Sequence, residues 1–369
     1  MRAAQVNLQR DWGGTERHVS LLSRGLRESG VQVLVCCDPR GGLMRDAARS
    51  GLECRSVSAA NQLDLAAALR LAARLARFRP DIVHAHTPRD FLAGFLASRM
   101  LGGARFVLTR HMMLPLKPIM RWVYSKSTAV ICLSSSVRTH LVAEGIPPVL
   151  LRRVRSGIDT TQFGCAGAIS QRPRLRREWG LDDTNVALGV VGRIVTGKGH
   201  DNVLDAAATL VRRESSDGPA SRLRILIIGE GPERGRLAAR TRDAGLEGVV
   251  QFTGPREDMP AALAALDGLV LASQSELLPL AVMEAMATGL PVIATEVGGL
   301  AEAIEPDCCG MLVPPGDSAA LATAICRIVG DPRLRMRLGA AAAVRARREY
   351  TLAAMATDTA SVYRDILAG

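Results

Sequence analysis

Aromatic side chains are scarce in this chain, and so are the motifs that mark several common functions. Phe, Trp and Tyr make up 3% of the 369 residues, so the core must be built from Leu, Val, Ile, Ala and Met. No C-x-x-C pair occurs among the eight cysteines, which argues against a zinc or redox site. No uncharged apolar run reaches about 18 residues, so no membrane-spanning helix is expected. The N-terminus lacks the long apolar stretch of a signal peptide.

The chain has no D-x-D triplet, the usual carboxylate pair for a divalent ion, so we expect no metal and no cofactor. The formal net charge of +11 comes mostly from arginine. Phosphorylated substrates, an anionic membrane, nucleic acid or a plain compositional bias would each account for this charge. We expect no nucleic-acid partner, because base-stacking aromatics are few and no nucleic-acid-binding motif is present. Most cysteines lie in or beside apolar runs, which suits buried thiols in a reducing cytoplasm.

Short apolar runs alternate with longer segments of helical periodicity along most of the chain. The runs predict strands at Arg2–Leu8, Val31–Cys36, Asp81–His86, Arg105–Arg110, Ala129–Leu133, Val186–Val191, Arg224–Ile228, Val249–Thr253, Leu269–Ala272 and Pro291–Ala294. The periodic segments predict helices at Thr15–Ser29, Leu63–Phe78, Asp90–Leu101, Ser135–Glu144, Asp201–Arg213, Glu233–Ala244, Asp258–Leu266, Pro279–Thr288 and Ser318–Val329.

This alternation requires right-handed crossovers and gives parallel sheets with helices on both faces. Two such series predict an α/β protein with two Rossmann-like domains that face each other across a cleft. We place the first domain at residues 1–165 and the second at 181–345, because the stretch from 160 to 180 is polar, basic and without a strand pattern. The helical pattern in residues 346–369 is expected to pack back on the first domain.

Ligands of open parallel sheets bind beyond the carboxyl ends of the strands, so the strand–helix junctions carry the most information. The first junction contains Gly13 and Gly14, which would let the backbone approach a ligand at the positive end of a helix. Thr15 is expected to cap that helix. The spacing is not G-x-G-x-x-G, which disfavours a dinucleotide site. An ordinary strand–helix turn is the alternative.

The second junction follows the strand that ends at Val191, where Arg193 and Lys198 bracket a glycine-containing loop. This is not the P-loop pattern, in which Ser or Thr follows the lysine directly. Two fixed cations beside flexible backbone suit a diphosphate, and they would neutralise charge on a leaving nucleotide without a metal. The alternative is a solvated surface turn.

The third junction is the segment Ser275–Pro291, with the sequence SELLPLAVMEAMATGLP. It places Glu276 on a loop and Glu284 inside the following helix, with seven residues between them. A carboxylate can accept paired hydrogen bonds from the vicinal hydroxyls of a ribose or hexose. A solvated helix face is the alternative for Glu284, although its neighbours are almost wholly apolar. Gly289 and Pro291 are expected to end the helix.

Together these junctions resemble the retaining family-four glycosyltransferases, which have the GT-B fold. The likeness extends over nearly the whole chain, and the pattern of Glu, seven residues, Glu is its most specific part. The other matching segments are Gly13–Glu16, Asp81–His86, Thr109–His111, Val130–Ser134, Ser156–Asp159 with Phe163, Gly192–Arg193 with Lys198–Gly199, Gly229–Pro232, Phe252–Gly254 and Asp267–Pro291.

The resemblance implies a role for each of these sites. Arg193 and Lys198 would hold the donor diphosphate, and Glu284 would bind the ribose hydroxyls. Two residues would be catalytic by contact with the transferred sugar, namely Glu276 and His111. The remaining donor contacts would come from Gly13, Gly14, Leu278, Pro279 and Leu280. His84 and His86 are explained equally well as core histidines at the end of a strand.

The implied reaction is a metal-independent, retaining transfer of a hexosyl-type group from a nucleotide diphosphate sugar to a glycan or lipid-linked acceptor. Cell-surface polysaccharide, lipopolysaccharide or glycolipid biosynthesis would be its setting. The leaving phosphate would accept the acceptor's proton, so no strong general base is assigned. A sugar-nucleotide epimerase and a non-catalytic nucleotide-sugar-binding protein are the alternatives. Two positions depart from the family pattern: Leu277 replaces the usual Gly, and Ser156 replaces the usual Asn.

Residues 99–126 carry six Lys or Arg residues and no Asp or Glu. Within them, residues 112–126 mix bulky apolar residues with cations, which is the composition of a segment that lies on anionic lipid. We therefore expect a cytoplasmic protein that docks on the inner face of the cell membrane. An ordinary buried loop and helix is the alternative.

Overall fold

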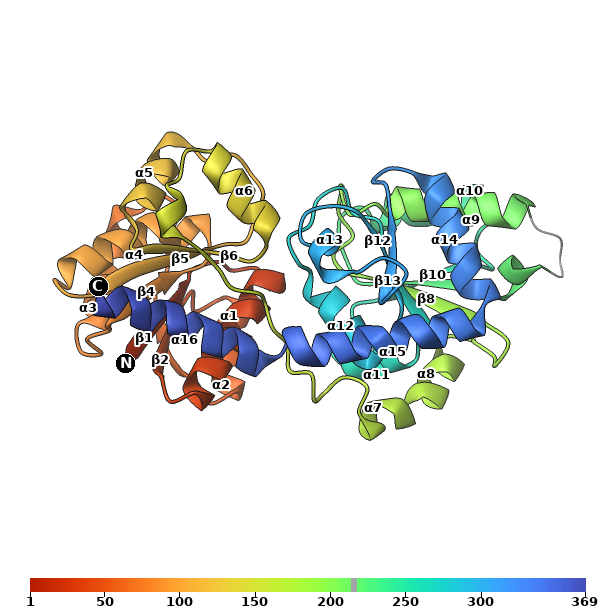
Figure 1. Cartoon of the computed structure of the whole chain (residues 1–369), viewed down its shortest axis with the longest axis horizontal. Helices are drawn as coiled ribbons and strands as arrows, with labels where there is room; N and C mark the ends of the chain where they lie inside the picture. Colours follow the sequence, from red (N-terminus) through yellow and green to blue (C-terminus); the bar gives the residue numbers. More distant parts are fainter. Residues whose placement is uncertain (214–217) are drawn as a thin grey trace. The chain divides into compact units, whose positions relative to one another are not determined.

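Two parallel sheets organise the chain, each within its own structural unit (Figure 1). The computed structural model describes residues 1–213 and 218–369. The first unit comprises Met1–Ile158 and Tyr350–Gly369, and the second comprises Asp159–Glu349. The chain therefore leaves the first unit once and returns to it for its last helix.

The first sheet has seven strands in the order β3-β2-β1-β4-β5-β6-β7. All of its strand pairs are parallel. The order reverses direction between β1 and β4, so the crossovers diverge at that point. The strands are β1 (Arg2–Asn7), β2 (Gln32–Cys37), β3 (Glu53–Ser56), β4 (Ile82–Ala85), β5 (Arg105–Arg110), β6 (Ala129–Cys132) and β7 (Leu151–Arg153).

Helices cover both faces of this sheet. The first-unit helices are α1 (Gly14–Glu28), α2 (Gly42–Arg49), α3 (Leu65–Leu75), α4 (Pro88–Met100), α5 (Pro118–Lys126), α6 (Ser135–Ala143) and α16 (Leu352–Ala368). One apolar cluster joins α1, α2 and α16 to the sheet, with Leu22, Ala47 and Ala356 fully buried. The helices α3, α4 and α5 pack against one another in sequence.

The second sheet repeats this topology with six parallel strands in the order β10-β9-β8-β11-β12-β13. Its direction reverses between β8 and β11. The strands are β8 (Val186–Val191), β9 (Leu223–Ile228), β10 (Val250–Gly254), β11 (Gly268–Leu271), β12 (Val292–Thr295) and β13 (Gly310–Val313).

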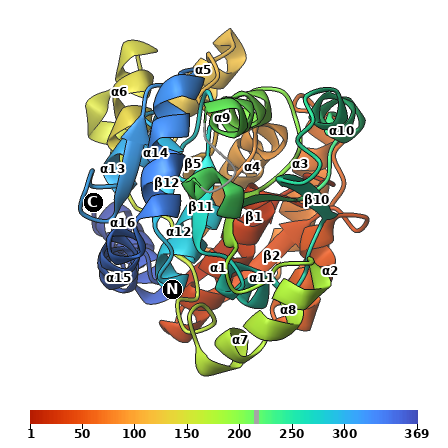
Figure 2. The same cartoon turned by 90° about the vertical axis from the view of Figure 1, so that its right-hand side faces the viewer.

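The helices of the second unit pack on this sheet in the same manner. They are α7 (Ala166–Ser170), α8 (Arg172–Glu178), α9 (His200–Arg213), α10 (Arg234–Asp243), α11 (Met259–Ala264), α12 (Leu280–Thr288), α13 (Leu300–Ala303), α14 (Ser318–Gly330) and α15 (Pro332–Glu349). The helices α9 and α14 lie side by side and share one apolar cluster with the strands (Figure 2). The helix α12 packs against α15.

All ten strands expected from the apolar runs are present, with ends shifted by at most two residues. The runs missed β3, β7 and β13. The first two are short edge strands whose ECRS and LRR sequences show no apolar run. Thr15 was the wrong cap, because α1 begins at Gly14 and its N-cap is Gly13. The polar stretch after residue 160 holds α7 and α8, which the strand criterion could not detect.

The chain's return to the first unit depends on close backbone contact at Gly157 and Ile158. The amide of Ile158 donates to Tyr350 O at 2.9 Å, and the amide of Leu352 donates to Ile158 O at 2.8 Å. A Cβ on Gly157 would lie 2.2 Å from Thr351 O, far inside normal contact distance. A side chain at Gly157 would therefore push α16 away from the sheet.

We expect Gly157→Ala to lower the free energy of unfolding by about 1–3 kcal/mol, the usual cost of overpacking. Thermal unfolding measured by circular dichroism would show this as a lower Tm. The control is Gly167→Ala on α7, where an added Cβ meets nothing within 4 Å. An unchanged Tm for Gly157→Ala would contradict the proposed contact.

Candidate active site

The site residues expected from the sequence lie at the carboxyl ends of the strands on either side of each reversal. In the second unit, Arg193 follows β8 and Glu276 follows β11, and these strands are neighbours in the sheet. In the first unit, Gly13 follows β1 and His86 follows β4, which are also neighbours. Diverging crossovers leave these loop ends open to a ligand.

The loops after β8 and β11 are joined by a short ion pair. Lys198 Nζ lies 2.6 Å from Glu276 Oε1, although 78 positions separate the two residues in the sequence. The hydroxyl of Ser273 donates to the same carboxylate oxygen at 2.7 Å. The amide of Gln274 donates to Gly197 O at 2.9 Å and fastens the two loops through their backbones.

Two glycines, one after β8 and one after β12, allow their backbones to lie close to the loop after β11. Gly199 has a φ of +73°, and a Cβ there would lie 1.8 Å from Ala272 O. Gly298 has a φ of +51°, and a Cβ there would lie 1.7 Å from Glu276 O. Any side chain at either position would displace the loop that carries Glu276.

The helix α12 follows Glu276 in the chain, with Pro279 as its N-cap and Leu280 as its first residue. Gly289 ends it in the left-handed conformation, as the sequence predicted. Glu284 lies inside the helix and is 1% exposed, so it does not belong to a solvated face. Leu278 and Pro279 are half-buried at the helix start, whereas Arg193 is exposed on the loop after β8.

In the first unit, the loop after β1 leads into α1 through Gly13 and Gly14. Gly13 is extended, and an added Cβ would lie 3.4 Å from Glu16 Oε2. Asn7 at the end of β1 donates to Glu16 Oε1 at 3.2 Å. Burial raises the pKa of Glu16 above its usual range.

A cluster of four histidines occupies the same edge of the first sheet. His84 and His86 come from β4 and its end, His111 follows β5, and His18 lies in the first turns of α1. The rings of His18 and His111 have centroids 4.7 Å apart, and those of His84 and His86 have centroids 4.1 Å apart. The sequence singled out three of these histidines and gave no role to His18.

One hydrogen-bond chain indicates which nitrogen of His86 and of His111 carries a proton. Gln5 donates from Nε2 to the Tyr363 hydroxyl at 3.0 Å, and its Oε1 accepts from His86 Nε2 at 2.8 Å. The lone pair of His86 therefore lies on Nδ1, where it accepts from His111 Nε2 at 3.3 Å. His111 Nδ1 is then an acceptor.

The same logic fixes His84. The Tyr363 hydroxyl accepts from Gln5 and keeps one proton of its own, which it can donate to His84 Nδ1 at 2.6 Å. His84 Nε2 then donates to the Thr109 hydroxyl at 2.7 Å. His18 Nδ1 contacts the Ser156 hydroxyl at 3.1 Å, at the position where the family usually has Asn. Tyr363 belongs to α16, so the last helix of the chain orients this cluster.

Burial keeps all four imidazoles neutral. It lowers the pKa of His18 to about 4 and that of His84 to about 3. The pKa values of His86 and His111 are lowered well below the usual 6.5, first by burial and then by the neighbouring histidines. At neutral pH the cluster offers hydrogen-bonding groups without a charge.

A buried carboxylate holds the strand ends that carry this cluster. Asp90 Oδ1 accepts from Leu8 N at 3.0 Å, and Oδ2 accepts from the amides of His86 at 2.9 Å and Thr87 at 2.7 Å. The Thr87 hydroxyl also donates to it, and the bond from the Thr87 amide is one half of a capping box at the start of α4. Burial nevertheless raises the pKa of Asp90 to about 6.

Among the described residues, one group could hold a metal ion. It consists of His18, His86 and His111, whose ligand nitrogens lie within 4.8 Å of one another. In the hydrogen-bonded arrangement above, the lone pair of His86 Nδ1 is already used by His111. That a metal takes no part stays a prediction.

Family models match both units. Residues 12–162 match Glycosyltransferase Family 4, and residues 171–345 match Glycosyl transferases group 1. An alpha-D-kanosaminyltransferase from Streptomyces kanamyceticus is 31% identical over 318 residues, which cover 81% of each chain. This chain belongs to the family-four glycosyltransferases.

A further relative and a solved structure are similar over even more of the chain. A 2-deoxystreptamine N-acetyl-D-glucosaminyltransferase from Streptomyces fradiae is 31% identical over 92% of this glycosyltransferase and 91% of its own length. The Anabaena HepE structure in complex with UDP-glucose superimposes with a TM-score of 0.87 at 21% identity and covers 99% of this chain and all of that one. The fold is therefore GT-B, and the enzyme class is glycosyltransferase rather than epimerase.

Sequence reasoning missed three groups that build the histidine cluster of this glycosyltransferase: Gln5, Asp90 and Tyr363. The alternation of His84 and His86 along one strand gave a usable signal, because residues two apart share a face. The capping-box pattern of Thr87 and Asp90 could also have been recognised in the sequence. Tyr363 is 358 positions from Gln5, and nothing local links the two.

We expect the stability of the first unit to fall as the pH decreases from 6.5 toward 4. Unfolded histidines take up protons in this range, whereas the buried ones do not, so protons favour the unfolded chain. Asp90 and Glu16, whose pKa values are raised, oppose this trend, but four histidines outweigh two acids. A loss of about 2 kcal/mol or more between pH 7 and pH 5 is expected, since one pKa unit corresponds to about 1.4 kcal/mol.

Urea-unfolding midpoints at pH 7, 6 and 5 would measure this dependence. His84→Gln should flatten it, whereas His140→Gln, outside the cluster on α6, should leave it unchanged. Equal pH dependence in the wild type and His84→Gln would contradict the assignment.

Proposed function

We propose that this glycosyltransferase transfers a glycosyl group from a nucleotide diphosphate sugar, with retention and without a metal, to a glycan or lipid-linked acceptor. The second unit would bind the donor, and the first would bind the acceptor. The Anabaena HepE structures contain UDP and UDP-glucose, which supports a nucleotide-sugar donor for a chain of the same fold.

The observation that carries this proposal is the contact between Lys198 and Glu276. A cation suited to phosphate and a carboxylate suited to sugar hydroxyls lie 2.6 Å apart. In a nucleotide diphosphate sugar, the sugar is attached directly to the outer phosphate. A cation and a carboxylate in contact therefore match the junction between the two parts of the donor.

The surrounding groups fit the rest of such a donor. The exposed Arg193 would add a second cation for the diphosphate, as its place on the loop after β8 allows. The backbone amides of Leu278 to Leu280 lie at the start of α12, which is the positive end of the helix dipole. They would donate hydrogen bonds to the negatively charged diphosphate. Glu284, within the same helix, would accept hydrogen bonds from the ribose hydroxyls.

In the first unit, Gly13 and Gly14 would let backbone approach the phosphates. His111 would accept a hydrogen bond from the donor sugar through Nδ1, the nitrogen that the Gln5–His86 chain leaves free to accept. A neutral imidazole suits this role, since it orients a hydroxyl without adding charge. The proton of the acceptor would pass to the leaving phosphate oxygen on the face of attack.

A second candidate acceptor comes from the relatives. Two Streptomyces proteins that are 31% identical to this chain are named for transfer to 2-deoxystreptamine. A soluble cyclic polyol of this kind would replace the lipid-linked acceptor and leave the donor site unchanged. Assays with 2-deoxystreptamine and with a polyprenyl-phosphate-linked sugar would distinguish the two.

The donor assignment predicts a different effect for each member of the ion pair. A thermal-shift panel of UDP-, GDP- and ADP-sugars would first select the donor. Lys198→Met should then weaken both the sugar nucleotide and its nucleoside diphosphate by roughly ten- to a hundredfold, as expected for a lost charged hydrogen bond. Glu276→Gln should weaken only the sugar nucleotide.

Glu247→Gln is the matched control, because this exposed carboxylate lies outside the site. Titration calorimetry would supply the affinities. If Lys198→Met and Glu276→Gln lost equal affinity for the nucleoside diphosphate, the proposal that Glu276 contacts the sugar would be wrong. No binding of any sugar nucleotide to the wild type would refute the proposed function.

The membrane proposal rests on the surface around α5. Four large apolar side chains are exposed there: Met112 (42%), Leu114 (55%), Ile119 (39%) and Trp122 (44%). The Trp122 ring packs on Phe95, and Phe95 lines a cavity of about 370 Å³ together with Arg99, Arg105 and Lys126 and no acidic residue. Among residues 1–213 and 218–369, no helix is long and apolar enough to span a bilayer. Apolar side chains beside cations suit adsorption on anionic lipid.

We expect the wild type to float with vesicles that contain anionic phospholipid at low salt, and to float less as salt screens the cations. Trp122→Ala should reduce the floated fraction severalfold. Leu69→Ala is the control, because Leu69 is 62% exposed on α3, outside this surface. Equal flotation with neutral vesicles, or no flotation at all, would contradict the proposal.

A further inference from the structure

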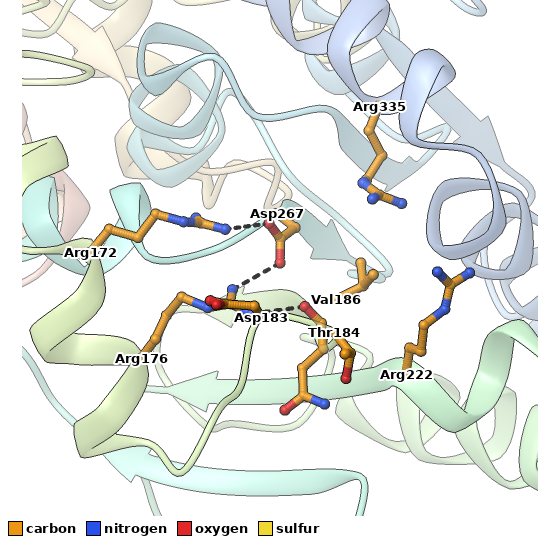
Figure 3. A pocket seen from close by; sticks show the side chains of 9 residues that line it. Arg172, Arg176, Asp183, Thr184, Val186, Arg222, Asp267 and Arg335 are labelled. Atoms are coloured by element: carbon orange, nitrogen blue, oxygen red, sulfur yellow. Dashed lines mark hydrogen bonds and ion pairs between the residues drawn. The ribbon is translucent and has the colours of Figure 1, made fainter.

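A second group of cations lies in the donor unit, away from the residues proposed for the donor. A cavity of about 340 Å³ is lined by Arg172, Arg176, Arg222 and Arg335, with two aspartates, Asp183 and Asp267 (Figure 3). This volume is within the range of small-molecule sites.

The cavity lies at the amino edge of the second sheet. Val186 begins β8, Arg222 precedes β9, and Asp267 precedes β11. The proposed donor residues lie at the carboxyl ends of the same strands. A six-residue strand separates the two edges by roughly 17–20 Å. One small ligand therefore cannot occupy both places.

Two of the four arginines share one carboxylate, that of Asp267. Arg172 donates to Asp267 Oδ1 at 2.6 Å, and Arg176 donates to Asp267 Oδ2 at 3.1 Å. The amide of Ala187 donates to the same carboxylate at 2.8 Å. Arg176 also donates to Asn185 O at 2.8 Å. These hydrogen bonds and ion pairs hold α8 against the sheet.

The other two arginines have no such partner. Within residues 1–213 and 218–369, no carboxylate forms an ion pair with Arg222 or Arg335, and the Arg222 side chain makes no hydrogen bond. Arg335 donates from Nη1 to Ile328 O at 2.6 Å and Val329 O at 2.9 Å. These two acceptors fix the position of its guanidinium at the end of α14. In Figure 3, the guanidinium groups of Arg222 and Arg335 face the same space.

The proximity of these two cations is unfavourable in itself. Burial is the main cause that lowers the pKa of Arg335. The Asp267 carboxylate opposes it, the positive charge of Arg222 lowers the pKa by less than Asp267 raises it, and Asp331 raises it least. Asp331 is engaged elsewhere, because its Oδ1 accepts from Leu334 N at 3.0 Å at the start of α15. An anion between the two guanidiniums would relieve the repulsion and use their planar donors.

We propose that this cavity binds the phosphoryl group of a small phosphorylated anion, held between Arg222 and Arg335. A guanidinium can bind phosphate oxygens in a bidentate manner, and the hydrogen-bonded Arg172–Asp267–Arg176 group forms the opposite wall. The site is separate from the proposed donor site and does not depend on it. Inorganic phosphate, a sugar phosphate and the nucleoside diphosphate product share this chemistry.

Calorimetric titration of the full chain with pyrophosphate at low salt tests the proposal. We expect saturable binding that weakens at least about tenfold in Arg222→Gln, as for the loss of a charged hydrogen bond. Arg224→Gln is the matched control, because Arg224 lies two residues along the chain and outside the cavity. The same titrations in a Lys198→Met background remove any contribution from the donor site.

Parallel titrations with inorganic phosphate, glucose 6-phosphate and UDP would identify the source of the phosphoryl group.

A second measurement separates a binding role from a structural one. Arg222→Gln should raise the Tm of the ligand-free protein, because it removes one of two neighbouring like charges. Absence of Arg222-dependent anion binding, or a lower Tm in Arg222→Gln, would overturn the proposal. Loss of binding in Lys198→Met alone would place the anion in the donor site and would also overturn it.

Discussion

Both units depend on the point where the strand order of a parallel sheet reverses. Crossovers leave this point in opposite directions, so the two loop ends diverge unless something joins them. In the first unit, the buried Asp90 carboxylate accepts amides from the ends of β1 and β4. In the second, the Lys198–Glu276 pair and a backbone bond to Gly197 join the ends of β8 and β11. The proposed site residues lie on or beside these two bridges.

The two bridges differ in chemistry, and the difference suits the functions proposed for them. Asp90 is buried and saturated with hydrogen bonds, so it acts as a fixed part of the frame. Lys198 is about one-third exposed, and its partner Glu276 is 9% exposed, so a ligand can reach the pair. A charged pair at a ligand site can exchange its mutual contact for contacts with phosphate and hydroxyl groups. A buried capping carboxylate cannot do so without unfolding the strand ends.

The last helix, α16, contributes Tyr363 to the hydrogen bonds of the histidine cluster. Tyr363 on α16 accepts from Gln5, Gln5 accepts from His86, and His86 accepts from His111, so this chain of bonds leads from α16 to His111. The position of one hydroxyl thereby decides which nitrogen of a distant imidazole accepts a hydrogen bond. Close packing of α16 at Gly157 keeps that hydroxyl in place. Substitutions in α16 can therefore alter the hydrogen bonding of the histidine cluster.

Local patterns in the sequence were sufficient for the fold class, the ten expected strands and the end of α12 at Gly289, because these depend on periodicity and on turn chemistry. They also identified Lys198 and Glu276, each within its own motif. They could not show that the two side chains touch, since this requires β8 and β11 to be neighbours across 78 positions. Neither could they find Tyr363 beside Gln5, or Arg222 beside Arg335. Such contacts arise only when the sheet order brings distant segments together, and no local pattern encodes that order.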